Sequence, residues 1–137
     1  MVQIATDNLR IPVPVGNEDV VFVCRRPRAK EISNFLNNRW RRGPRGKIID
    51  RLYDARREFV DSILIDVENV TWKTAAGETA PLNAGTVLTE ADRQHWSEML
   101  GEPVASWKDL IPLNWKSAVA MHFEDALNFS QEDEEGN

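Results

Sequence analysis

The sequence predicts an α+β fold, and two patterns along the chain indicate this class. Residues 20–24 form a run of β-branched and aromatic side chains, which is typical of a strand. Apolar residues in 47–68 recur at three- and four-residue steps, the spacing of an amphipathic helix. A chain of 137 residues is long enough for one domain with a hydrophobic core. We therefore expect a single α+β domain over residues 1–130, followed by a disordered acidic tail at 131–137.

The N-terminal part of the chain predicts a β-hairpin. Residues 11–15 alternate apolar side chains with two prolines, which places such a strand at a sheet edge. Residues 16–19 form a turn signal, and the strand 20–24 follows it. Cys24 is the only cysteine, so no disulfide can form within one chain, and we expect its thiol to be buried on this strand.

Two helices are predicted next, as an antiparallel helical hairpin. Pro27 is suited to open the first helix, which is expected to reach Arg42. Glycine and proline at 43–46 end that helix and form a short link. The second helix, 47–68, contains no Gly or Pro and would be about 30 Å long. It is the expected centre of the core.

The C-terminal half predicts a second small hairpin and further helices. The hairpin pairs residues 70–72 with 79–82 around a Gly-containing turn. Thr89 precedes an acidic first turn, which is a helix N-cap signal, and Gly101 ends that helix. Pro112 opens the last helix.

Charge is distributed unevenly along a chain whose net charge is −5. Residues 25–57 contain twelve Lys/Arg and three Asp/Glu, whereas residues 58–137 contain four Lys/Arg and sixteen Asp/Glu. The basic segment is densest at Arg39, Trp40, Arg41 and Arg42. Cations beside an aromatic ring suit phosphates and bases, but the acidic remainder would repel a nucleic acid at long range. The alternative partner is an acidic protein, or the acidic half of a second copy. Trp40 also falls in phase with the first helix, so core packing explains it equally well.

No pattern predicts catalysis, a metal site or a cofactor. His95 and His122 have no second ligand at metal spacing, and no nucleophile stands beside a candidate base. One helix face carries four carboxylates that could bind a metal, but interleaved arginines favour ordinary ion pairs; these are Asp50, Asp54, Glu58 and Asp61. We expect a protein without enzymatic activity.

With no signal peptide and no apolar run of membrane-spanning length, we also expect a cytoplasmic protein.

The order of these patterns resembles the small tail assembly chaperones of long-tailed bacteriophages and prophages. The resemblance covers roughly residues 11–128. The matching stretches are VVFVCRRP at 20–27, Glu31, Ile32, Phe35 and Leu36 of the first helix, ARREFVDSIL at 55–64, VENV at 67–70, the turn that contains Gly77, IPLNWK at 111–116 and FE at 123–124.

This resemblance implies a non-enzymatic protein of the host cytoplasm that binds the tape-measure protein and tail-tube subunits during tail assembly. It also implies self-association, because such chaperones often form oligomers, and in this family a longer product can arise by translational frameshift. An amphipathic partner requires an apolar surface with a charged rim. Trp40, Trp72 and Trp107 are candidates for that surface together with the three arginines 39, 41 and 42, because each tryptophan lies at or beyond the end of a predicted element. Core packing is the alternative for each tryptophan.

Overall fold

The computed structural model describes residue 1 and residues 7–135, with side chains through residue 126. Its class is α+β, as the sequence predicts. The chain divides into two compact units, each assembled from two separate stretches of sequence. Unit 1 comprises Met1–Arg26 and Leu64–Pro112, and unit 2 comprises Pro27–Ile63 and Leu113–Asn137. The predicted single domain over 1–130 stays a prediction.

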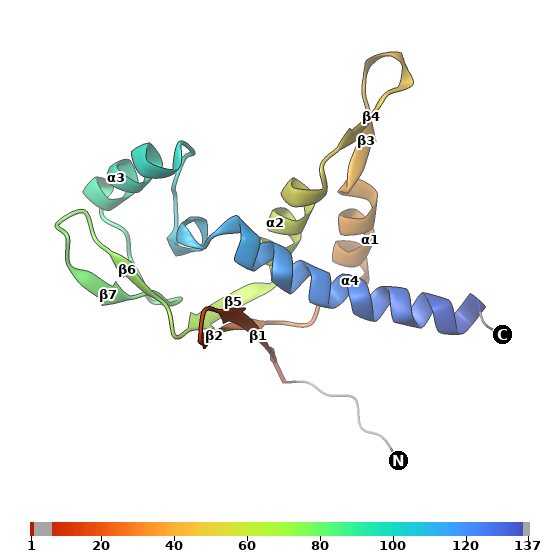
Figure 1. Ribbon diagram of the computed structural model, residues 1–137, viewed down its shortest axis with the longest axis horizontal. Helices are drawn as coiled ribbons and strands as arrows, with labels where there is room; N and C mark the ends of the chain where they lie inside the picture. Colours follow the sequence, from red (N-terminus) through yellow and green to blue (C-terminus); the bar gives the residue numbers. More distant parts are fainter. Residues whose placement is uncertain (2–6, 136–137) are drawn as a thin grey trace. The chain divides into compact units, whose positions relative to one another are not determined.

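Unit 1 contains a three-stranded antiparallel sheet with the order β1-β2-β5 (Figure 1). Its strands are β1 (Leu9–Val15), β2 (Glu18–Cys24) and β5 (Leu64–Glu68). The predicted N-terminal hairpin is confirmed, and the proline-bearing strand lies at the edge, where its missing N–H groups break no ladder bond. One face of the sheet is buried. It carries three cross-strand pairs of buried side chains, which are Val13 with Val20, Ile11 with Phe22, and Cys24 with Leu64.

The rest of unit 1 is a second hairpin and a helix. β6 (Thr71–Lys73) pairs with β7 (Thr79–Pro81), as predicted. α3 (Glu90–Leu100) begins after Thr89, whose hydroxyl accepts a hydrogen bond from Asp92 N, and ends at Gly101 with a positive φ of 70°. Both predicted caps are confirmed. A short 3₁₀ helix, η2 (Trp107–Leu110), precedes the return to unit 2.

Unit 2 consists of three helices and a two-stranded hairpin. The helices are α1 (Ala29–Asn38), α2 (Leu52–Ile63) and α4 (Leu113–Glu135). Phe59 of α2 stacks on Phe35 of α1 at 4.8 Å between ring centroids, and meets Phe123 of α4 edge-on at 5.4 Å. Between α1 and α2 the chain forms β3 (Trp40–Arg42), the 3₁₀ turn η1 (Pro44–Gly46) and β4 (Ile48–Asp50). Figure 1 shows this hairpin extending past the ends of α1 and α2.

The predicted long helix over 47–68 is wrong at both ends. Residues 48–50 pair with 40–42 as strand β4, so the first helix also ends at Asn38 instead of Arg42. Residues 64–68 pair with β2 as strand β5, with a register shift opposite Val23 and Cys24. Only the middle 12 residues are helical. Pairing with distant strands therefore overrides a helical spacing that these residues also satisfy.

The last helix begins after Pro112, as predicted. The backbone of α4 runs through Glu135 and so enters the segment 131–137, for which the sequence predicts a disordered acidic tail. Residues 136–137 lie outside the described residues, and the tail stays a prediction.

Candidate functional site

The candidate site is the hairpin that projects from α1 and α2 in unit 2. We call residues 39–50 the basic arm. Its ladder pairs Trp40 with Asp50 and Arg42 with Ile48. At its base, Arg39 O accepts a hydrogen bond of 3.0 Å from the Arg51 amide, which continues the ladder to the start of α2. The carboxylate of Asp50 accepts a 2.8 Å hydrogen bond from the Leu52 amide, which has no partner within the helix.

The tip of the arm is a tight loop that needs its glycines. Gly43 N donates to Lys47 O at 2.6 Å, which closes the loop. Arg45 and Gly46 both have positive φ, 63° and 76°, so the chain reverses through the left-handed region. A Cβ on Gly43 would lie 2.6 Å from the Cδ1 atom of Ile49. The bare backbone at this position therefore lets the Ile49 side chain cover it.

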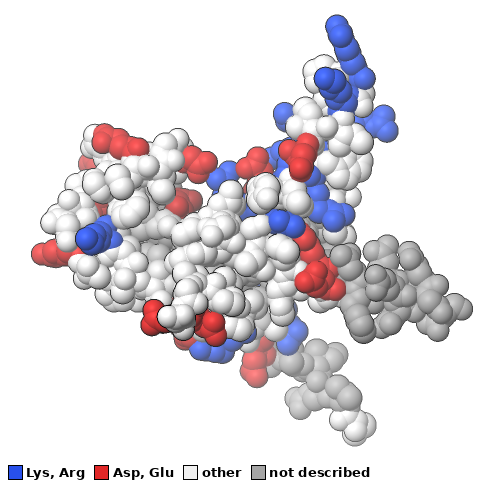
Figure 2. All heavy atoms as spheres, in the orientation of Figure 1, with Lys and Arg blue, Asp and Glu red and all other residues white. Residues whose placement is uncertain are grey.

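The arm carries five cations and one carboxylate, Asp50. Figure 2 shows Lys and Arg side chains gathered at the end of the hairpin. In the described part of the chain, the exposed side chains of Arg41, Arg42, Arg45 and Lys47 make no hydrogen bond or ion pair. Like charges held close together raise the local positive potential, so an anionic partner would be attracted to this surface.

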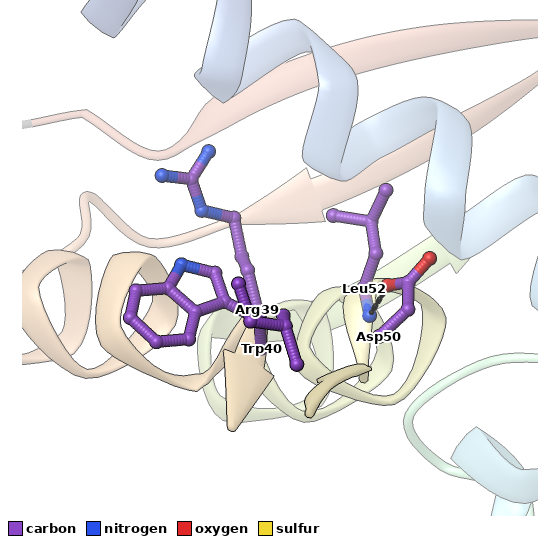
Figure 3. Close-up of a pocket in the computed structure, with 5 residues that line it drawn as sticks. Arg39, Trp40, Asp50 and Leu52 are labelled. Carbon is purple, nitrogen blue, oxygen red and sulfur yellow. Dashed lines mark hydrogen bonds between the residues drawn. The ribbon is translucent and has the colours of Figure 1, made fainter. Parts of the chain in front are cut away.

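One side of the arm has an open pocket of about 420 Å³. It is lined by Arg39, Trp40, Ile48, Asp50 and Leu52. Figure 3 shows Arg39 and Trp40 on one side of the pocket, with Asp50 and Leu52 on the other. Trp40 is 50% exposed and Ile48 is 71% exposed. An aromatic and an aliphatic side chain at these exposures, beside unpaired cations, form a surface suited to another macromolecule.

The structure brings together four of the six predicted partner-binding residues. Arg39, Trp40, Arg41 and Arg42 are consecutive at the start of the arm, and the interpretation of Trp40 as a core residue is wrong. Trp72 and Trp107 belong to unit 1 and are each only 9% exposed. Their burial favours the core-packing alternative, because they present little surface to a partner. Their partner-binding role stays a prediction.

Two exposed apolar residues, one in the arm and one in α2, were not predicted as surface. Ile48 and Tyr53 were assigned to the buried stripe of the long helix, yet Tyr53 is 60% exposed. The guanidinium of Arg56 lies over the Tyr53 ring, 5.8 Å from its centroid. Both residues fit the helical spacing of the apolar stripe, which predicts burial, and no local sequence signal distinguishes them from the core positions.

The four carboxylates that were considered as metal ligands each bind a different partner. Asp54 pairs with Arg57 at 3.1 Å, Glu58 with Arg51 at 3.4 Å, and Asp61 with Lys116 at 2.8 Å. The fourth, at position 50, accepts the hydrogen bond from the Leu52 amide that is described above. Within residues 7–126, no group of three or more His, Cys, Asp or Glu side chains is arranged to hold a metal ion.

Two ion pairs with little solvent exposure join α2 to α4, and the sequence did not point to either. Lys116 is 2% exposed at its side chain and reaches Asp61. Arg56 donates to both Glu124 oxygens, at 2.9 and 3.0 Å, and to the Ser117 hydroxyl at 2.9 Å. Hydrogen bonding to Glu124 raises the pKa of Arg56. These contacts fix α4 on α2, the helix that follows the arm.

Cys24 is not placed for nucleophilic chemistry. It is fully buried on β2, and this burial raises the pKa of its thiol to about 12, although Lys108 opposes the shift. The thiolate is the reactive form of cysteine, so a thiol with this pKa is inert at neutral pH. The prediction of a buried strand cysteine is confirmed.

Among the helices of the described residues, none combines the length and apolar character that crossing a membrane requires. Comparisons with protein-family models, with curated proteins and with solved structures find no match to this chain.

Proposed function

We propose that this protein is a phage tail assembly chaperone that binds the tape-measure protein and tail-tube subunits in the host cytoplasm. The proposal begins from the resemblance of residues 11–128 to that family. The observation that carries it is the basic arm, which offers exposed cations and apolar side chains outside a packed body. In this role the protein has no enzymatic activity and requires no cofactor.

The arm suits a long partner with an acidic, amphipathic surface. Trp40 and Ile48 supply apolar contact area beside the open pocket, and the arginines of β3 supply a charged rim. A two-stranded ribbon is only marginally stable by itself in water. Contact with a partner would therefore order the arm and bury its exposed apolar area at the same time.

The test is a search of the neighbouring genes for a long helical protein, followed by its co-expression with this chain and pull-down. Reversing two arm charges in R41E/R42E should strongly reduce capture, because attraction to an acidic surface becomes repulsion. The control R26E/K73E changes the net charge equally at two exposed residues of unit 1. Undiminished capture by R41E/R42E, or the lack of a long helical protein gene nearby, would count against the proposal.

A small nucleic-acid-binding module over residues 25–57 is the second candidate. The observation that favours it is that the densest cations lie on a two-stranded antiparallel ribbon, a shape that some proteins insert into a DNA groove. Four phosphate contacts would give a slope of log affinity against log salt of about −3 to −4. A mobility shift with DNA and RNA over a salt series measures this slope. A flat response, or no shift at low salt, would exclude this candidate.

A further inference from the structure

The basic arm has a complement within the same sequence. We call residues 125–137 the acidic segment. It contains five Asp/Glu and no Lys or Arg, against five cations and one carboxylate in the arm. It also includes two large apolar residues, Leu127 and Phe129. The arm shows the matching pair of features, which are unpaired cations and an open pocket beside Trp40.

Among the residues whose side chains the structure describes, no pairing joins the two regions within one chain. Figure 1 shows the arm leaving the helices of unit 2 in a different direction from the C-terminal end of α4. In the part of the chain with described side chains, no ion pair joins the arm to α4. Glu124, the carboxylate immediately before the acidic segment, is already bound to Arg56 in the same chain. This pair holds the start of the segment on α2.

We propose that the basic arm of one copy binds the acidic segment of a second copy. The occupant follows from charge, because the segment supplies as many carboxylates as the arm has cations. The pocket of about 420 Å³ has room for an apolar side chain of the kind that the segment carries. If the two copies exchange these regions reciprocally, each dimer contains the contact twice, as a two-fold interface requires.

This inference does not rest on the chaperone proposal, since it needs no phage protein. Any other acidic partner of the arm, whatever its identity, would compete with the acidic segment for the same cations. Self-association would then fall as the partner binds.

The test is sedimentation equilibrium of the purified full chain at low and high salt. The wild type should associate at low salt, and the association should weaken as salt screens exposed charges. Both R41E/R42E and E132K/E134K should weaken it by roughly tenfold or more, because each replaces attraction by repulsion at two positions. The unit 1 control R26E/K73E, with the same charge change as the arm variant, should associate like the wild type. Circular dichroism establishes that each variant is folded.

Mixing the two reversed variants gives the decisive result. In a mixed dimer the two new glutamates of one arm should attract the two new lysines of the other copy's segment, and the unchanged arm and the unchanged segment should bind each other. The equimolar mixture should therefore associate more strongly than either variant does alone. A wild type that stays monomeric at low salt would overturn the proposal. Unchanged association of R41E/R42E, or a mixture that stays monomeric, would overturn it as well.

Discussion

Replacing Asp61 by Asn should destabilise the protein more than replacing Lys116 by Met, although each change breaks the same ion pair. The side chain of Lys116 is 2% exposed and that of Asp61 is 29% exposed. Asp61→Asn leaves a fully buried ammonium without this carboxylate, which costs about 3–5 kcal/mol for a buried pair. Lys116→Met leaves a carboxylate that is 29% exposed as a side chain, although its Oδ1 atom is buried, and the Met side chain fills the vacated volume, so the cost is about 1–2 kcal/mol.

Urea unfolding followed by far-UV circular dichroism measures both free energies of unfolding. The matched control is Asp54→Asn, which breaks the exposed pair with Arg57 on the same helix. It should cost less than about 1 kcal/mol. An apolar replacement of both partners, D61L/K116M, should recover much of the loss, since no buried charge remains. Equal losses for the two single variants, or a larger loss for Lys116→Met, would refute the reasoning from burial.

Three further predictions concern single side chains. Ellman's reagent should react with Cys24 only after urea unfolds the chain, because burial raises the pKa of its thiol to about 12; rapid labelling of the native protein would contradict this. Gly43→Ala should displace the Ile49 side chain from the arm, with a stability cost of about 1–3 kcal/mol, and methyl NMR shifts at Ile49 measure the displacement. Hydrogen bonds from the Ala75 and Thr89 amides lower the pKa of Asp92 from 3.8. The stability that Asp92 contributes should therefore be present above pH 3.8 and lost as pH falls through its lower folded-state pKa. The gap in unfolding free energy between wild type and Asp92→Asn should close on acidification, and a gap independent of pH would refute this assignment.

The elements that could be predicted from sequence are those with local signals at their ends. The prolines of residues 11–15 placed β1 at an edge, and Thr89 and Gly101 marked both ends of α3. These signals act through backbone groups only a few residues away, so no knowledge of the tertiary structure is needed to interpret them.

The long helix failed because its ends have partners elsewhere in the chain. Residues 64–68 pair with β2, about 40 positions or more away along the sequence. Their apolar spacing fits a helix and a buried strand equally well. Asp50 is a helix-capping residue type, and it was the one local signal that could have located the true start of α2.

The candidate site was predictable in composition but not in shape. The cluster at residues 39–42 was recognised from charge, but a ribbon with Trp40 exposed on it requires the strand pairing with residues 48–50. Trp72 and Trp107 were selected as surface because they lie near element ends, yet both are buried. Lys116 had no signal at all, because lysine is almost never fully buried unless it is paired.

The interleaving of the two units has a consequence for synthesis on the ribosome. Residues 27–63 emerge early, but α4, which covers Phe59 and neutralises Asp61, is made only after the whole of residues 64–112. Until then the nascent chain exposes an apolar face of α2 and leaves its charged groups without their final partners. Unit 2 can therefore complete its folding only after α4 has been made, and a chain released before residue 113 would present that face to chaperones and proteases.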